Sequence, residues 1–402
     1  MEKFNRKLRQ TQYQEEKQKK QRNKLVIGIA VLLVLSLLVV VFVYFRKEEK
    51  CYDRYEVIRS EAHSEEKAAY LAYGDGYVRY DRDGAQAYNA DGSQLWNLAY
   101  NLKNPTLDVC SGYAVVADKG SKTFYIIDPT GGSKSYEARG KIAQVRVAAQ
   151  GVTAVLTTDA KEDHIYLYAP SSSDILVDIK TQTAVNGFPI TMALSPDGTK
   201  LVTSYMTIET DAWLSWVTFY NFGEVGQNYV DNMVGSYSFE AMIPEVKFVS
   251  ADMVAVVRDN GFELYQMAET PKVKYTENFS TRIKSTFSNT EYTGFVLEKS
   301  ETQTADRLLL YKNANSRKLL DIPLEAEYSN IYVANGEVVL WDTLSCAILR
   351  PNGEIKFQTV FTKNVKYIFS TNHEEQYIVV GDQTVELLQL KEAEKKSTKK
   401  DE

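Results

Sequence analysis

Two hydrophobic patterns divide the chain. Residues 25–45 read LVIGIAVLLVLSLLVVVFVYF, a run of 21 residues without a charge. As a helix this run is close in length to the hydrocarbon thickness of a bilayer, ~30 Å. From Tyr55 onward the apolar runs are short and alternate with turns such as Asp-Gly and Asn-Gly, which is typical of β-hairpins. The pattern predicts one transmembrane helix followed by an all-β region.

The hairpins recur at a regular spacing. If the start of the most apolar strand in each unit is taken as a marker, successive markers lie 36 to 54 residues apart. A repeat of ~40 residues with four short strands per unit is the signature of a β-propeller blade. The markers predict about eight four-stranded blades, with seven as the alternative because the spacing is irregular in the middle of the chain: Tyr77, Tyr113, Val152, Thr199, Met253, Tyr292, Glu337 and Gln376.

The ends of the repeat region predict how the ring closes. The last unit supplies only three strands, VKYIFST, QYIVVGD and TVELLQL, whereas Tyr55–Ser60 precedes the first full unit and has no partner of its own. We expect Tyr55–Ser60 to be the fourth strand of the last blade. This closure removes two free sheet edges, which would otherwise template aggregation.

The charge distribution predicts the topology. Residues 1–45 contain nine Lys or Arg and three Glu, a net charge of +6, which leaves −12 on the rest of a chain whose total is −6. Because basic residues flank the helix on its N-terminal side, the positive-inside rule places the N-terminus in the cytoplasm. The apolar run exceeds the 7–15 residues of a signal peptide and ends in Val-Tyr-Phe-Arg, which favours an uncleaved anchor in the cell membrane.

The predicted organisation therefore has five parts. They are a basic cytoplasmic tail (1–24), a transmembrane helix (25–45), a juxtamembrane linker (46–54), an extracytoplasmic propeller (55–390) and a charged disordered tail (391–402). Three cysteines are too few for a disulfide-stapled domain. Cys51 stands beside the predicted membrane helix, where it could cross-link two copies into a homodimer.

Two segments resemble known propeller repeats. Ser195-Pro196-Asp197-Gly198-Thr199 resembles the repeat of WD40-like and TolB-like propellers. The segment from Gly84 to Trp96, with its Asp-Gly and Leu-Trp pairs, resembles a quinoprotein-type blade. An anchor joined to one propeller is similar to an uncharacterised family of Gram-positive bacterial membrane proteins of unknown function. The resemblance implies a fold and no chemistry.

The sequence predicts no catalytic residue, no metal ligand and no cofactor. The histidines, His63, His164 and His373, show no metal-ligand spacing and are expected at the surface. The chain has no P-loop, no Gly-x-Ser-x-Gly and no dinucleotide fingerprint. A nucleic-acid partner is disfavoured because the outer domain is acidic.

The predicted partner-binding residues lie on one face of the ring. If the strands of a blade are labelled a to d from the axis outward, the b–c and d–a connections share one face, and the chain enters and leaves the ring at the other. The longest predicted b–c and d–a loops are Thr158–Asp163, Thr207–Ala212, Val234–Glu245 and Glu298–Asp306. We expect a protein-binding surface of acidic residues around aromatic anchors, although core packing explains part of the aromatic cluster: Glu162, Asp163, Glu209, Asp211, Trp213, Tyr237 and Phe239.

These inferences predict a membrane-anchored propeller that acts as a protein-binding or scaffolding module at the cell envelope. The partner is expected to be an envelope or membrane protein. The alternative is an enzyme, or a sensor of a small molecule or sugar, with its site in the central channel of the propeller.

Overall fold

The computed structural model describes residues 26–43, 50–63, 67–159, 162–209 and 212–392. The chain divides into two units, residues 1–51 with 394–402 and residues 52–393. The first unit contains the helix Val26–Val43, which is long and apolar enough to cross a membrane, as either an anchor or a signal sequence would be. The predicted basic tail and most of the charged C-terminal tail lie outside the described residues.

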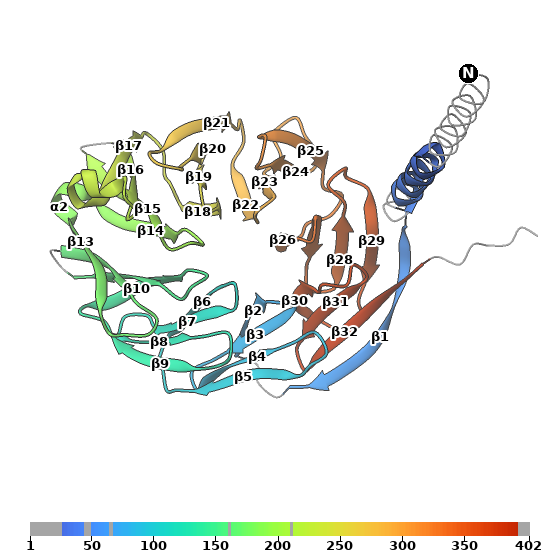
Figure 1. Cartoon of the computed structure of the whole chain (residues 1–402), viewed down its shortest axis with the longest axis horizontal. Coiled ribbons are helices and arrows are strands. Elements are labelled where there is room, and N and C mark those ends of the chain that lie inside the picture. Colours follow the sequence, from blue (N-terminus) through green and yellow to red (C-terminus); the bar gives the residue numbers. More distant parts are fainter. Residues whose placement is uncertain (1–25, 44–49, 64–66, 160–161, 210–211, 393–402) are drawn as a thin grey trace, which may run out of the picture. The chain divides into compact units, whose positions relative to one another are not determined.

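The second unit is a ring of eight four-stranded blades around a central opening (Figure 1). Within the described residues, blades 1 to 4 consist of β2 (Ala69–Tyr73), β3 (Gly76–Tyr80), β4 (Gly84–Tyr88) and β5 (Gln94–Ala99); β6 (Pro105–Cys110), β7 (Tyr113–Asp118), β8 (Thr123–Ile127) and β9 (Ser133–Glu137); β10 (Lys141–Val147), β11 (Thr153–Thr158), β12 (Glu162–Tyr168) and β13 (Ile175–Gln182); and β14 (Phe188–Leu194), β15 (Lys200–Glu209), β16 (Ala212–Asn221) and β17 (Met233–Phe239).

Blades 5 to 7 repeat this order, and blade 8 combines the two ends of the ring. The strands are β18 (Glu245–Ser250), β19 (Met253–Arg258), β20 (Gly261–Gln266) and β21 (Lys272–Asn278); β22 (Ile283–Ser288), β23 (Tyr292–Leu297), β24 (Arg307–Lys312) and β25 (Arg317–Pro323); β26 (Asn330–Ala334), β27 (Glu337–Trp341), β28 (Ser345–Leu349) and β29 (Ile355–Val360); and β30 (Val365–Ser370), β31 (Gln376–Gly381), β32 (Thr384–Glu392) and β1 (Tyr52–Ala62).

The predicted repeat is confirmed, with eight blades rather than seven. Each of the eight sequence markers lies within one residue of the first residue of a b strand, for example Tyr113 in β7 and Thr199 before β15. The b strand is buried on both faces in most blades, as the all-buried pattern of Tyr292–Leu297 illustrates. A strand buried on both faces has a continuous apolar sequence, and this explains why the most apolar run marked each blade.

Ring closure occurs as predicted. Strand β1 pairs antiparallel with β32, with Tyr55 opposite Leu390 and Ser60 opposite Glu386. The strand is longer than the expected Tyr55–Ser60 and begins at Tyr52, which also pairs in parallel with Phe357 of blade 7. Figure 1 shows β1 beside β32, so the first and last strands of the ring form one blade.

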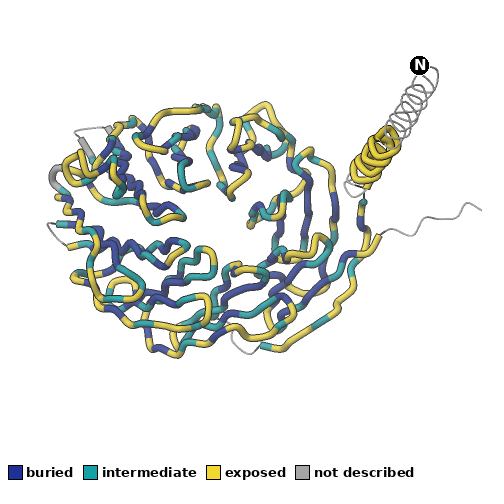
Figure 2. Tube along the Cα trace, in the orientation of Figure 1, coloured by how far each residue is buried: buried dark blue, intermediate teal, exposed yellow. Residues whose placement is uncertain are grey.

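The core is distributed between the blades. Eight clusters of buried apolar side chains each join two adjacent blades, including blades 8 and 1, where Tyr77 and Ala90 pack with Phe369 and Ile378. In Figure 2 the buried stretches run along the strands, with exposed residues at the connections and on the outer strands. Each blade buries its faces only against its neighbours, so the ring must close to complete the core.

Blade 4 departs from the predicted loops. Strands β15 and β16 extend to Glu209 and from Ala212, so the expected loop Thr207–Ala212 is wrong, and its tip falls outside the described residues. Strand β17 runs to Phe239, so most of the expected connection Val234–Glu245 is strand as well. The physical reason is pairing with β16, which satisfies the backbone hydrogen bonds of the polar and aromatic residues here.

The b–c connection of blade 6, residues 298–306, has the predicted length. The predicted connection Thr158–Asp163 of blade 3 is too long, because Thr158 ends β11 and Glu162 and Asp163 begin β12. The long connection in blade 4 is c–d, residues 222–232, which includes the short 3₁₀ helices η1 (Gly226–Asn228) and η2 (Val230–Asn232). Because it is a c–d connection, it lies on the face opposite to the one favoured by the sequence.

Candidate functional site

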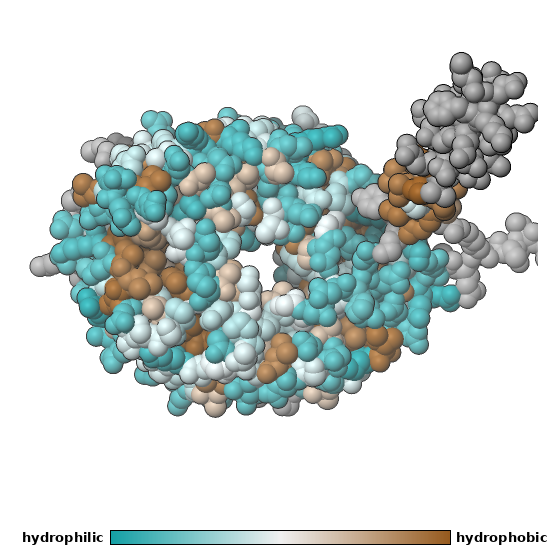
Figure 3. Space-filling view, in the orientation of Figure 1, coloured by the Kyte–Doolittle hydropathy of each residue, from teal (hydrophilic) through white to brown (hydrophobic). Residues whose placement is uncertain are grey.

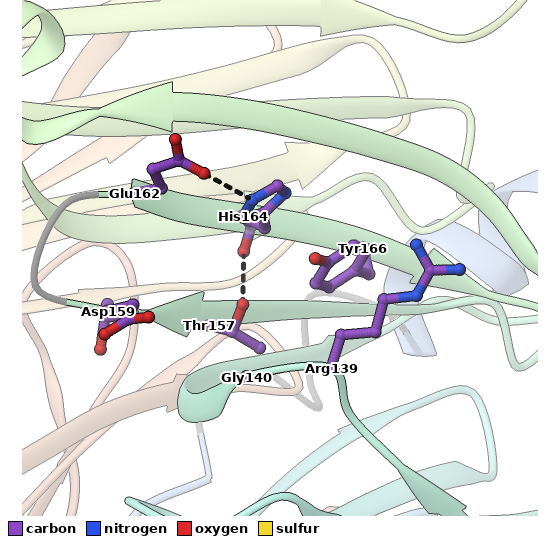
Figure 4. Close-up of a pocket in the computed structure, with 8 residues that line it drawn as sticks. Arg139, Gly140, Thr157, Asp159, Glu162, His164 and Tyr166 are labelled. Atoms are coloured by element: carbon purple, nitrogen blue, oxygen red, sulfur yellow. Dashed lines mark hydrogen bonds and ion pairs between the residues drawn. The ribbon is translucent and has the colours of Figure 1, made fainter.

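A cavity of about 480 Å³ opens beside blade 3 (Figure 4). It is lined by the connection between blades 2 and 3, the end of β11 and the start of β12. The lining residues are Arg139, Gly140, Thr157, Thr158, Asp159, Glu162, His164 and Tyr166. Since these segments are the d–a and b–c ends of their strands, the cavity belongs to the face on which the sequence predicted partner binding.

Alternation along β12 builds the polar wall of this cavity. Glu162, His164 and Tyr166 occupy every second position, so their side chains share one face of the strand. The His164 ring stacks on Tyr166, with ring centroids 5.2 Å apart and planes 4° from parallel. The Arg139 guanidinium lies over the same tyrosine ring at 5.7 Å. Tyr166 therefore supports both cation-forming groups of the cavity.

His164 lies between two carboxylates. Its Nδ1 is 2.8 Å from Asp178 Oδ1 on β13, and its Nε2 is 3.9 Å from Glu162 Oε2. Lys180 Nζ lies 2.8 Å from the other oxygen of Glu162. The Lys180 hydrogen bond holds the pKa of Glu162 below its ordinary value. Acidic and basic groups thus alternate across the outer strands of blade 3.

The Thr157 hydroxyl of this cavity bonds to the main chain rather than to the His164 ring. The hydroxyl of Thr157 donates to the main-chain carbonyl of His164 at 3.4 Å and not to its ring (Figure 4). Nucleophilic catalysis needs a hydroxyl or thiol within hydrogen-bond reach of its base. A mixed-charge pocket floored by an aromatic ring is typical of the polar part of a protein interface.

The structure separates the two acidic residues predicted beside each other in this region. Glu162 lines the cavity, as expected of a surface residue. Asp163 points the opposite way and is only 3% exposed, so its expected place in an acidic rim is wrong. Its Oδ2 accepts a hydrogen bond from Thr183 Oγ1 at 3.2 Å, in the short helix α2 (Thr183–Asn186). Burial raises the pKa of Asp163.

The predicted residues Glu209 and Trp213 lie at the hairpin end of β15 and β16 in blade 4. Glu209 ends β15 and pairs with Ala212, and Trp213 pairs with Ile208 across the hairpin. Asp211 lies outside the described residues. Strand β14 pairs with β15 only as far as Met206, so the last ladder pairs of the hairpin project beyond it.

The two predicted aromatic anchors of β17 lie in a strand and face the neighbouring blade. Tyr237 is 39% exposed, and its hydroxyl donates to the carbonyl of Pro271 in blade 5 at 3.1 Å. Its ring also packs on Phe219 and Tyr265. Phe239 is half-buried against the core between blades 4 and 5. These residues therefore do not join Glu162 in a single rim.

Exposed apolar side chains gather instead in blade 4. Among the described residues of the ring, this blade holds five large apolar side chains that are exposed, and no other blade holds more than three. They are Phe188 and Tyr237, toward the d–a end of the blade, and Tyr229, Val230 and Met233, at its c–d end on the opposite face. Figure 3 shows an apolar area over blades 3 and 4 on the one face that it displays.

The family of the chain follows from comparison with known proteins. A model described as "Family of unknown function (DUF5711)" matches residues 47–390. The chain belongs to this family. No curated protein matches the chain significantly.

Solved structures similar to this DUF5711 ring are propellers. BamB from Moraxella catarrhalis is 13% identical with a TM-score of 0.52, and the match covers 84% of this chain and 98% of that one. Sqt1 from Saccharomyces cerevisiae is 12% identical with a TM-score of 0.55, covering 86% and 99%. At these identities the likeness establishes the fold and leaves the function to the site.

Sequence reasoning missed most of the cavity. His164 was expected to be an isolated surface residue, yet it contacts Asp178, which lies on the next strand. The alternation of Glu162, His164 and Tyr166 was the available sequence signal, because residues two apart in a strand share a face. Arg139 carried no such signal, since it reaches the cavity from a connection between two blades.

Proposed function

We propose that this DUF5711 chain is a single-pass membrane protein with a cytoplasmic N-terminus and an extracytoplasmic propeller that binds another envelope protein as a scaffold. The observation that carries the proposal is the concentration of exposed apolar side chains in blade 4. Three of these side chains, Tyr229, Val230 and Met233, lie at the c–d end of the blade within five positions of one another, and burial of such exposed apolar surface by a partner is favourable.

The c–d connection of blade 4 displays its apolar residues in a constrained backbone. Val230 is 81% exposed and is followed by Asp231 and Asn232, whose φ angles of 54° and 59° are left-handed. Residues other than glycine adopt this region at a cost, and such residues are frequent in functional loops. The backbone of this connection therefore holds the Val230 side chain in contact with solvent at some conformational cost.

The charged cavity of blade 3 opens on the face opposite to the c–d connection of blade 4, so it is not the polar rim of the same surface. Glu162, His164 and Arg139 offer both signs of charge within that separate pocket. We propose that the partner seats an apolar segment on the c–d connection of blade 4.

The experiment compares two surfaces of similar exposure on the full-length chain. Tyr229, Val230 and Met233 are changed to Ser in one variant. In the matched control Leu344, Ile355 and Val360 of blade 7, which are also exposed, are changed to Ser. Each full-length variant is cross-linked to neighbouring proteins in the native membrane, and the captured proteins are identified by mass spectrometry. We expect loss of one envelope protein in the blade 4 variant only. Equal capture by both variants would refute the proposal.

A further inference from the structure

Three charged residues lie on innermost strands, which line the central channel that Figure 3 shows open at the middle of the ring. Asp108, Arg146 and Lys247 lie on the innermost strands β6, β10 and β18 of blades 2, 3 and 5. The positive charges of Arg146 and Lys247 both act on Asp108, although burial dominates and raises its pKa. Blades 2 and 5 are not neighbours, so their side chains can approach each other only in the channel.

The two carboxylates of this region have their own hydrogen-bond donors. Asp108 Oδ2 accepts from the main-chain N–H of Val147 at 2.9 Å. Glu245, two residues before Lys247, accepts from the Thr286 hydroxyl of blade 6. Both acidic groups are thus engaged by neutral donors from a neighbouring blade.

The two cations are engaged by main-chain carbonyls. Arg146 Nη1 donates to the carbonyl of Val145 at 2.9 Å, and Lys247 Nζ donates to that of Ser288 at 3.0 Å. Among the described residues, neither cation has a carboxylate oxygen within 4.0 Å. A guanidinium carries five N–H donors and an ammonium three, so each group has donors beyond the one hydrogen bond described for it.

The channel walls also affect the charge on Lys247. Lys247 is exposed to solvent on the innermost strand of blade 5, yet protein surrounds it, and this burial lowers the pKa of Lys247 against the opposing charges of Glu245 and Asp108. A partly desolvated cation is stabilised by an anion that contacts it directly. Arg146 adds a planar fork of donors that matches the oxygen spacing of carboxylate and phosphate groups.

We propose that the central channel is a binding site for a small oxyanion, a carboxylate or a phosphate, held between Arg146 and Lys247. This site is separate from the blade 4 surface, so either proposal can fail alone. It assigns the channel a ligand class and gives the propeller a second binding capacity.

The test is isothermal titration calorimetry of the full-length chain in detergent micelles at pH 7 and low salt. The probes are inorganic phosphate and succinate. Saturable binding of phosphate alone identifies the ligand class as phosphate, and binding of succinate alone identifies it as carboxylate. Binding of both shows a site for the shared oxyanion chemistry. Binding of neither probe overturns the proposal.

Variants locate the binding in the channel. Arg146→Gln and Lys247→Gln should each weaken the bound probe at least about tenfold, the loss of one charge-assisted hydrogen bond. The matched control is Lys274→Gln, because Lys274 also donates to a carbonyl of the next blade, Ala314, but from the outer strand β21. Unchanged affinity in both channel variants, or an equal loss in the control, contradicts the assignment.

Two further variants control for misfolding and test whether the ligand is an anion. Arg146→Lys keeps the positive charge and removes the planar set of guanidinium donors. This variant should fold even if Arg146→Gln does not, and it should bind the probe more weakly than the native chain. Asp108→Asn keeps an oxygen for the Val147 N–H and removes a negative charge near both cations. It should tighten oxyanion binding by a few fold; weaker binding of both probes would contradict an oxyanion site.

Discussion

The hydroxyl of Tyr52 donates a hydrogen bond to Glu375 Oε1 at 2.8 Å, joining residues 323 positions apart. Tyr52 is the first residue of β1, and Glu375 precedes β31 of the same blade. Burial, with the Glu375 carboxylate next, raises the pKa of Tyr52, so its hydroxyl stays protonated and donates at neutral pH. The contact holds the start of the ring to its end.

Removing this contact should weaken the closed ring. We expect Tyr52→Phe to lower the free energy of unfolding by about 1–2 kcal/mol, as for a hydrogen bond to a charged group. Deletion of residues 52–62 should go further and cause aggregation, because it frees the edges of β32 and β29. Urea unfolding and size-exclusion chromatography measure both. Tyr229→Phe, at an exposed site, is the control and should have no effect.

A buried ion pair within blade 7 is hydrogen-bonded to blade 8. Lys356 is 4% exposed, and its Nζ lies 2.5 Å from Glu337 Oε1, whose second oxygen accepts from Tyr377 of blade 8 at 2.5 Å. Lys356→Met should cost about 3–5 kcal/mol of unfolding free energy, because Glu337 would remain buried without its cation. The double variant Lys356→Met with Glu337→Gln should recover most of that loss. A single variant as stable as the native chain would show that the pair contributes nothing.

The carboxylate of Asp128, in the turn between β8 and β9, predicts that the stability of the fold depends on pH. Hydrogen bonds from Thr130, and from the main-chain N–H groups of Thr130 and Gly132, lower the pKa of Asp128 from its ordinary value of 3.8. Its stabilising effect is therefore present above pH ~4 and is lost as the pH falls through the lowered pKa. Asp128→Asn should cost about 1 kcal/mol or less at pH 7 and less again at pH 3. Asp174→Asn, in the corresponding connection of blade 3, controls for loss of one surface charge.

Thiol chemistry tests the predicted topology. Cys346 is buried, and burial raises its pKa to about 12; burial also raises the pKa of the half-buried Cys110. Both thiols should react slowly, so the exposed Cys51 should dominate labelling. A membrane-impermeant maleimide should label intact cells, and Cys51→Ser should abolish the signal. Labelling that appears only after lysis would reverse the predicted orientation. A dimer on a non-reducing gel, absent in Cys51→Ser, would support cross-linking.

The sequence by itself determined the repeat and the closing strand, and it favoured eight blades over the alternative of seven. Each b strand is buried on both faces, so its apolar run is visible without knowledge of its neighbours, as Met253–Arg258 illustrates. The turns between strands were also local, because Asp197 accepts from the backbone of Thr199 two residues away. Closure by Tyr55–Ser60 followed from counting strands, since one blade lacked a member.

Only the tertiary structure decided which side chains meet. Asp163 and Glu162 are adjacent and chemically similar. Asp163 is buried and bonded to Thr183 in α2, whereas Glu162 pairs with Lys180 of β13 at the surface. Tyr237 was expected on a loop, and its place in β17 depends on pairing with Val217. Arg146 and Lys247 come from blades that are not adjacent, about 100 residues apart. Periodicity reports the face of a strand and not what lies opposite it, because contacts across the ring depend on how the blades are arranged.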